Sequence, residues 1–236
     1  MKNVFKVENE EIVFRRANIE DNLEQIAELI YLTDPYIYPF WFNNSITKAC
    51  KFLPNLLKEE GHLFSIDNFY IAQDKETKDI VGILCAVDKN TPLNGGYEKY
   101  KKINKRYRFT LERYIEELEK EISEYDQPGM IYISNICINP DLRGKQIGSK
   151  LIGYFISQME ELYFHTFALD CLLHNLRAKN LYHSMGFREM KEIVGFDGTE
   201  HSKVEVVSFL RKKGAYYPEE FNYRFLDIKK NRRKKK

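Results

Sequence analysis

The most constraining feature of the chain is a regular alternation of strand-like and helix-like segments in its second half. Apolar runs at residues 131–138 and 167–173 have the length and composition of strands. Each run is followed by a segment with apolar residues at helical spacing, at residues 147–162 and 176–185. Strands that alternate with helices in this way predict an α/β domain with a mixed sheet.

The first half of the chain adds elements of the same kind. Residues 12–16 predict a strand, and Asn18 predicts the N-cap of a helix that ends before Pro35. A second helix is expected from about Ser45 to Glu60. The remaining expected strands are residues 69–73 and 80–87, which form a hairpin, and residues 187–196 and 204–210.

Residues 89–129 interrupt this pattern with a cluster of turn residues and a charged segment that carries an apolar stripe. They predict a helical insert between the third and fourth expected strands, either a lid over a site or a dimer contact. The chain has 236 residues, of which 43% are apolar, enough for one sizeable core. We expect a single domain at residues 1–212 and a C-terminal extension at residues 213–236.

Basic residues are concentrated at the end of that extension. Seven of the residues 229–236 are Lys or Arg, whereas the whole chain has 37 basic and 35 acidic residues. The rest of the chain is therefore acidic overall, which argues against a general nucleic-acid-coating role for the folded part. The basic tail predicts a solvated extension, and the alternative is salt-dependent docking on RNA, ribosomes or another anionic surface.

The chain shows no targeting or membrane signal. Its N-terminus has no apolar stretch long enough for a signal peptide, and the apolar run at residues 80–87 is far shorter than a membrane span. The four cysteines lie far apart, without a C-x-x-C pair that would indicate a metal or redox site. We expect a cytoplasmic protein with reduced, mostly buried thiols, no membrane partner and no metal.

One strand–loop–helix segment has residues suited to anion binding. The strand ends at Ile138, and the loop before the next helix contains Arg143, Gly144, Lys145 and Gly148. Backbone N–H groups at a helix start, together with the positive end of the helix dipole, bind phosphate or pyrophosphate. The alternative is an ordinary joint with exposed basic side chains, because short glycine-containing loops also occur by chance.

A second segment favours the anion-binding interpretation. Asn175 follows a strand, Ala178 lets a neighbour pack close, and Tyr182 lies one turn further on the same helix face. The chain resembles the GNAT superfamily of N-acetyltransferases in two motifs, Arg143-x-x-Gln146-x-Gly148 and Asn175-x-x-Ala178-x-x-Leu181-Tyr182-x-x-x-Gly186-Phe187. The resemblance covers residues 130–196, and the order of elements from residue 12 onward is compatible with the same fold.

The resemblance implies a fold and a reaction. The expected sheet is twisted, mixed and mostly antiparallel, with two central parallel strands that splay apart and helices on its flanks. The expected reaction transfers an acetyl group from acetyl-CoA to a primary amine of a small molecule, peptide or protein terminus. In this family the amine attacks the thioester directly, in a ternary complex without an acyl-enzyme.

The resemblance also implies roles for individual residues. Tyr182, whose hydroxyl is protonated at neutral pH, would donate a proton to the departing CoA thiolate. Asn175 would bond the pantetheine arm or the backbone beside it. The expected cofactor-binding residues are Ile136, Cys137 and Ile138, whose backbone would polarise the thioester; Arg143, Gly144, Lys145, Gln146, Ile147, Gly148 and Ser149, which would hold the pyrophosphate; and Asn175, Ala178 and Tyr182.

Two departures from the family pattern bear on these roles. Gln146 stands where the family usually has glycine, so the backbone there must accept a side chain. The strand at residues 130–138 contains no Asp or Glu, although several family members have a glutamate there as general base. Asp170 and His174 are the nearest candidate bases, and they share a strand face if that strand stays regular to residue 174.

Several alternatives stay open at this point. Tyr182 is either the acid or an aromatic core residue, and the aromatic cluster at residues 36–42 is either core or a wall of the acceptor site. Asp170 has a structural alternative, and His174 a surface one. The protein is the acetyltransferase, a CoA-binding regulatory module without turnover, or an RNA- or ribosome-associated protein acting through its tail. A homodimer is compatible with each of these.

Overall fold

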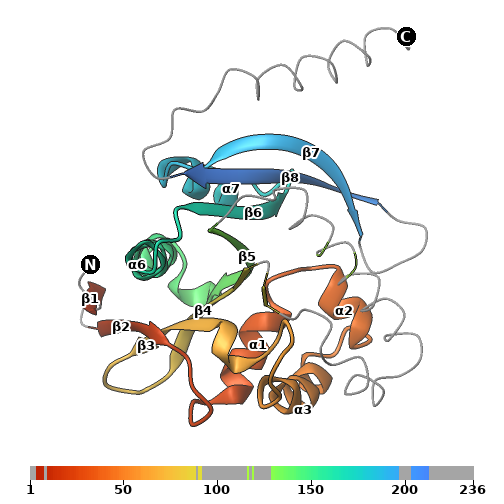
Figure 1. Cartoon of the computed structure of the whole chain (residues 1–236). Helices are drawn as coiled ribbons and strands as arrows, with labels where there is room; N and C mark the ends of the chain where they lie inside the picture. The colour runs from red at the N-terminus through yellow and green to blue at the C-terminus, as the bar shows by residue number, and fades with distance from the viewer. Residues whose placement is uncertain are drawn as a thin grey trace, which may run out of the picture.

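A computed structural model describes residues 4–7, 10–88, 90–91, 116, 119, 129–196 and 203–212 (Figure 1). The strands are β1 (Val4–Val7), β2 (Glu10–Arg16), β3 (Phe69–Asp74), β4 (Ile80–Asp88), β5 (Met130–Ile138), β6 (Thr166–Leu172), β7 (Arg188–Phe196) and β8 (Lys203–Lys212). The α-helices are α1 (Leu23–Tyr31), α2 (Ile37–Trp41), α3 (Ile46–Leu57), α6 (Ile147–Glu161) and α7 (Leu176–Ser184). The described residues also form two short 3-10 helices, η1 (Ile66–Asn68) and η2 (Pro140–Leu142).

The described strands form one eight-stranded sheet in the order β1-β2-β3-β4-β5-β6-β8-β7. Neighbouring strands are antiparallel except β5 and β6, which are parallel. The expected mixed, mostly antiparallel sheet is therefore confirmed. Strand β1 was not expected, because its four residues are too few to show a clear alternation of apolar and polar side chains. The insert consequently follows the fourth strand of the structure rather than the third.

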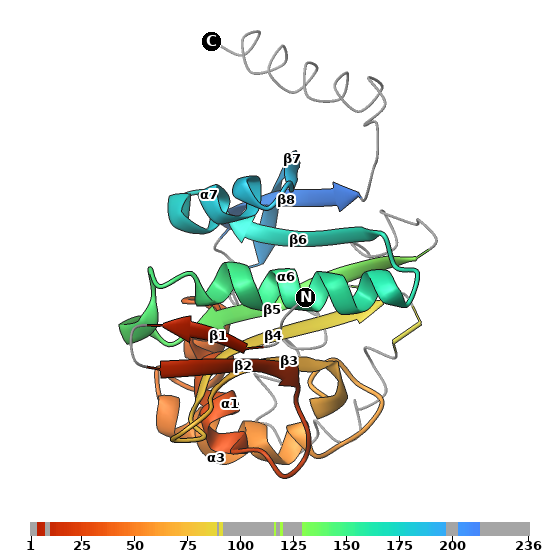
Figure 2. The same cartoon turned by 90° about the vertical axis from the view of Figure 1, so that its left-hand side faces the viewer.

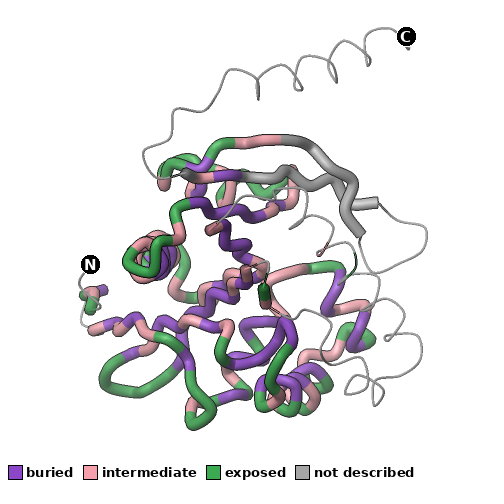
Figure 3. Tube along the Cα trace, viewed as in Figure 1, coloured by how far each residue is buried: buried purple, intermediate pink, exposed green. Residues whose placement is uncertain are grey.

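Alternate residues of the central strands pack into two different cores. In β4, Ile83 and Cys85 belong to the core built with α1, α2 and α3, whereas Leu84 belongs to the core built with α6. Figure 2 shows α6 in front of the sheet, running roughly along its strands, whereas α1 and α3 lie at the bottom of the picture. The middle strands are buried along most of their length (Figure 3). Burial on both faces explains why β4 is an almost continuous apolar run in the sequence.

The parallel pair separates halfway along its length. The paired stretch ends at Ile133 and Leu169, although β5 continues to Ile138 and β6 to Leu172. We call this diverging stretch the splay. A β-bulge lies at the same point, because Cys85 of β4 pairs with Asn135 while Ala86 pairs with Ile133, which leaves one extra residue in β5.

The bulge changes which side chains of β5 share a face. In a regular strand, residues at an odd separation point to opposite faces. Tyr132 nevertheless belongs to the core on the α1–α3 side, and Asn135, three residues later, bonds to Thr33 and Tyr38 on that same side. The extra residue therefore brings two polar side chains of β5 to the α1–α3 face at the start of the splay.

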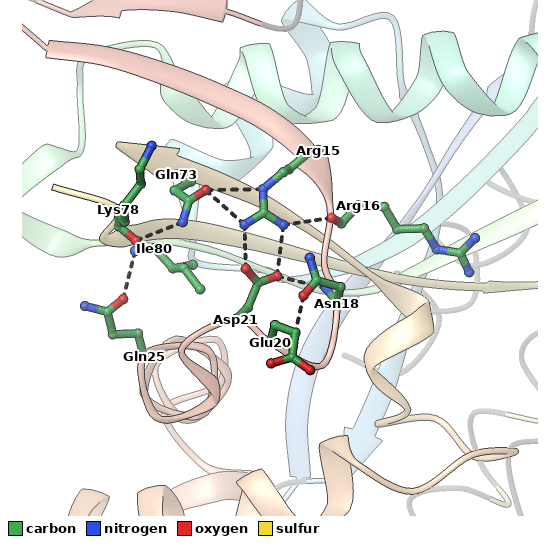
Figure 4. A network of polar contacts seen from close by, with 9 residues as sticks. All are labelled: Arg15, Arg16, Asn18, Glu20, Asp21, Gln25, Gln73, Lys78 and Ile80. Carbon is green, nitrogen blue, oxygen red and sulfur yellow. Dashed lines mark hydrogen bonds and ion pairs between the residues drawn. The ribbon is translucent and has the colours of Figure 1, made fainter. Parts of the chain in front are cut away.

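A polar network fixes the start of α1 against the sheet (Figure 4). Arg15 of β2 donates to Asp21 Oδ2 at 2.9 Å and to Gln73 Oε1 of β3 at 2.9 Å. Because Asp21 also accepts from the backbone of Asn18, residues 18–21 form a turn rather than the first turn of the helix. The predicted cap at Asn18 is wrong, and Asn22 caps α1 instead by accepting from the backbone of Gln25.

We expect Asp21→Asn to lower the free energy of unfolding by about 2 kcal/mol, because the Arg15 guanidinium would lose its charged partner in a partly buried position. The Asp21 side chain is 7% exposed and that of Arg15 is 29% exposed. Urea denaturation measures the change. Glu20→Gln removes an exposed carboxylate one residue away and should leave the unfolding curve unaltered. Equal effects of the two substitutions would contradict this role for Asp21.

The aromatic cluster between α1 and α3 is mainly core. Tyr38, Trp41 and Phe42 are buried, and the rings of Tyr38 and Trp41 meet edge to face with their centroids 5.4 Å apart. Tyr36 is exposed. Of the two alternatives for residues 36–42, the packing favours the core. α2, which carries most of these residues, was not expected from the sequence.

Two expected segments lie outside the described residues. The insert at residues 89–129 is described only at residues 90–91, 116, 119 and 129, of which Glu116 and Glu119 are helical. The basic tail is not among the described residues. In the part of the chain that is described, no helix has the length and apolar character needed to cross a bilayer.

Candidate active site

In the splay, the edge of β5 that faces β6 makes no strand pairing with it. Ile136, Cys137 and Ile138 pair with β4 on their other side, opposite Leu84, Ile83 and Gly82 respectively. Since β6 no longer pairs with this stretch, the backbone groups on the β6 side can bond to an extended ligand that carries amide groups. In the structure, these three expected residues thus share a stretch of β5 that pairs with β4 but not with β6.

The expected anion site lies at the start of α6, directly after β5 and η2. Its N-cap residue, Gln146, makes no side-chain hydrogen bond to the first turn. The nearby Ser149 hydroxyl donates to the Gln146 carbonyl at 2.8 Å instead of accepting from the backbone. Because helix starts have unsatisfied N–H groups, this uncapped turn is suited to bind an anion.

The loop before α6 depends on two left-handed residues. Gly144 has φ 90° and Gln146 has φ 63°. Glycine adopts such angles without a steric penalty, whereas a side chain costs about 1 kcal/mol or more. The backbone at Gln146 is therefore in the conformation that glycine would favour. The glutamine nevertheless adopts it, and α6 begins at the next residue.

Arginine side chains flank this loop from two directions. Arg143 Nε donates to the Ile138 carbonyl at 3.0 Å, so its side chain folds back over the end of β5. Arg177 of α7 comes from the other side, with Nη2 3.6 Å from the position that a Cβ on Gly144 would occupy. Sequence reasoning missed Arg177, although it lies inside the Asn175-x-x-Ala178 motif. Its location adds a second cation beside the expected pyrophosphate site.

α7 lies against the same loop and presents Tyr182 to the α6 side of the sheet. Asn175 Oδ1 accepts from the Ala178 backbone at 3.2 Å and caps α7, so its amide nitrogen is the group available for a ligand. Tyr182 is 5% exposed and belongs to the core built with α6. Burial raises the pKa of Tyr182 above its ordinary value, so the hydroxyl stays protonated at neutral pH.

The two candidate bases are not brought together. β6 ends at Leu172, so His174 lies in the turn before α7 and is exposed. His174 would share a strand face with Asp170 only if β6 stayed regular to residue 174, and the strand ends two residues earlier. Asp170 lies at the start of the splay on the α1–α3 side, where its Oδ2 accepts from the Tyr132 hydroxyl at 2.7 Å.

Two further polar residues at the splay were not among the expected site residues. Tyr132 bonds to Asp170, and Asn135 donates from Nδ2 to Thr33 Oγ1 at 2.9 Å and to the Tyr38 hydroxyl at 2.8 Å. Burial raises the pKa of Tyr38. Only the bulge brings Tyr132 and Asn135 to one face, and no residue pattern in the strand indicates it.

The thiols near the splay are poor nucleophiles. All four cysteines are free, and Cys85, Cys137 and Cys171 are buried. Burial raises the pKa of Cys85 to about 12 and that of Cys171 to about 11, so neither forms a thiolate at neutral pH. Within the described residues, no three His, Cys, Asp or Glu side chains are grouped as metal ligands would be.

Comparison with models of known protein families identifies one family. Residues 41–187 match the family model described as the acetyltransferase (GNAT) family. The solved structures with similar folds include an apo variant of agmatine N-acetyltransferase, with 15% identity, 86% of this chain and 99% of that chain covered, and a TM-score of 0.58.

Two further structures show the same likeness. An N-acetyltransferase from Staphylococcus aureus Mu50 has 16% identity and a TM-score of 0.55, with 84% of this chain and 99% of that chain covered. A NatC complex bound to Gag peptide and CoA has 19% identity and a TM-score of 0.51, with 86% and 98% covered. At these identities the likeness shows the fold. No curated protein matches the chain in sequence.

Proposed function

Because this chain belongs to the GNAT family of acetyltransferases, we propose that it transfers an acetyl group from acetyl-CoA to a primary amine in a ternary complex. The observation that carries the proposal is the splay of β5 and β6 beside the uncapped start of α6. The open strand edge would hold the pantetheine arm, and the helix start would hold the pyrophosphate.

The chain's own residues would bind acetyl-CoA in three places. Backbone N–H groups between Arg143 and Ser149 would bond the pyrophosphate, with Arg177 adding positive charge beside them. Backbone groups of Ile136 to Ile138 would bond the pantetheine and polarise the thioester carbonyl. The Asn175 amide nitrogen would bond the pantetheine or the backbone beside it. This donor site would lie on the α6 and α7 side of the sheet.

Candidate acid and base groups lie on opposite faces of the sheet. Tyr182 is part of the core on the α6 side, and Asp170 lies on the α1–α3 side next to Tyr132. We propose that the amine nitrogen attacks the thioester carbon from the Asp170 side, and the C–S bond then breaks. The leaving sulfur would take the Tyr182 proton, Asp170 would accept the proton lost by the amine, and solvent would restore both groups. His174, exposed and outside β6, is a weaker candidate for the base.

Calorimetric titration with acetyl-CoA, and separately with CoA, tests the donor site. We expect micromolar binding, about −8 kcal/mol, followed by thiol release when primary amines are added. Absence of binding at millimolar ligand to folded protein would overturn the proposal. Binding without thiol release for any primary amine would favour the CoA-binding regulatory module instead.

A further inference from the structure

Two buried oxygen atoms at the splay accept no hydrogen bond from any described residue. They are Oδ1 of Asn135 on β5 and Oδ1 of Asp170 on β6. The Asn135 residue is 5% exposed, and both atoms are inaccessible to solvent. Buried acceptors are nearly always paired in folded proteins, so a pair of unfilled ones indicates a ligand or bound water.

The orientation of the Asn135 amide follows from its neighbours. The Thr33 hydroxyl donates its only proton to the Ile30 carbonyl at 2.7 Å. Thr33 Oγ1 can therefore only accept from Asn135, so the atom that faces it at 2.9 Å must be the amide nitrogen. The carbonyl oxygen consequently points away from Thr33 and stays without a donor.

The carboxylate of Asp170 also has one oxygen without a hydrogen bond. Its Oδ2 accepts a hydrogen bond from the Tyr132 hydroxyl, whereas its Oδ1 accepts none. Among the described residues, no Lys or Arg forms an ion pair with it. Asn135 and Asp170 flank the splay on the same face of the sheet, each just beyond the last β5–β6 pair. A ligand between them would meet one negative charge and two acceptors, with apolar core around it.

We propose that Asn135 and Asp170 form a subsite for a primary ammonium group, with one N–H bonded to Asn135 Oδ1 and another to Asp170 Oδ1. This inference rests on the proposed function and names the form in which the acceptor binds: a cation with at least two N–H donors. The bound ammonium would pass one proton to Asp170, and from there to solvent, before its nitrogen attacks the thioester. The proton lost after the attack would follow the same route. Asn135 is then a specificity-determining residue. An alcohol would bring one donor and no charge, and a tertiary ammonium only one N–H, so each would leave an oxygen unfilled.

The test measures binding rather than turnover, with n-hexylamine, 1-hexanol and N,N-dimethylhexylamine as probes. Each is titrated calorimetrically at neutral pH, where the amines are protonated, with and without saturating CoA. The wild-type protein should bind n-hexylamine at least about tenfold more tightly than either of the other two probes. Equal binding of all three probes would overturn the proposal. It would indicate that the two oxygens accept hydrogen bonds from water and not from the ligand.

Variants then assign the preference to the two residues. Asp170→Asn and Asn135→Ala should each reduce the amine preference to about threefold or less while acetyl-CoA binding is retained. Ser134→Ala removes a hydroxyl from the residue next to Asn135 and should keep the full preference. A preserved preference in Asp170→Asn would overturn the proposal.

The outcomes separate this inference from the proposed function. Absence of the amine preference in wild-type protein that still binds acetyl-CoA counts against the subsite alone, whereas failure of the wild-type protein to bind acetyl-CoA counts against the donor site. Thermal unfolding is recorded for every variant. If a variant does not fold, the wild-type comparison of the three probes still decides the question.

Discussion

Gly148→Asp should weaken acetyl-CoA binding by about a hundredfold, which corresponds to about 2.7 kcal/mol. A Cβ at position 148 would lie 3.5 Å from Ile138 and 3.7 Å from Leu181, both ordinary contacts, so the loop can accept the side chain. The new carboxylate would lie in the first turn of α6, where it would occupy the N–H groups and repel the pyrophosphate. Calorimetric titration with acetyl-CoA measures the loss.

Gly148→Asn is the matched control, because it has the same shape without the charge. It should lower the affinity by less than about tenfold. A carboxylate at a helix start stabilises the helix, so the melting temperature of the Asp variant should be unchanged or higher. If the Asp and Asn variants bind acetyl-CoA equally, the pyrophosphate does not lie at the start of α6.

Tyr182→Phe is expected to lower acetylation turnover at least about tenfold, or about 1.4 kcal/mol of transition-state stabilisation, while acetyl-CoA affinity stays the same. The Tyr182 ring is buried against Phe187, with centroids 6.0 Å apart, and a phenylalanine ring can keep this contact. The variant therefore removes the proton donor rather than the packing. Thiol release at saturating acetyl-CoA measures the turnover.

Tyr154→Phe provides the control for this prediction. Tyr154 lies on α6 and packs on Phe14 and Tyr70, in contact with strands far from the splay, so loss of its hydroxyl should leave turnover unchanged. Unchanged turnover in Tyr182→Phe would eliminate Tyr182 as the acid. A thioester with a more acidic thiol should restore the rate of Tyr182→Phe, because such a thiolate leaves without a proton.

The elements with strong periodicity were predictable from the sequence. The apolar spacing after Gln146 predicted α6 almost to its observed ends, and Gly186, two residues after the last residue of α7, marked the end of that helix. Helix caps were harder to predict where a residue distant in the sequence changes the local hydrogen bonds. Asn18 and Asn22 are both suitable caps, and the bond of Asp21 to Arg15 on β2 decides for Asn22.

The expected acetyl-CoA site could be predicted from the sequence, because it would consist of backbone groups whose position follows from a local strand–loop–helix motif. The residues that meet on the opposite face of the sheet could not be predicted, because they come together through contacts between distant parts of the chain. Tyr132 meets Asp170 across 38 residues, and Asn135 meets Thr33 across 102. These contacts depend on the pairing of β4 with β5 and on the bulge between them. A bulge is set by the register of neighbouring strands, which no local pattern of side chains encodes.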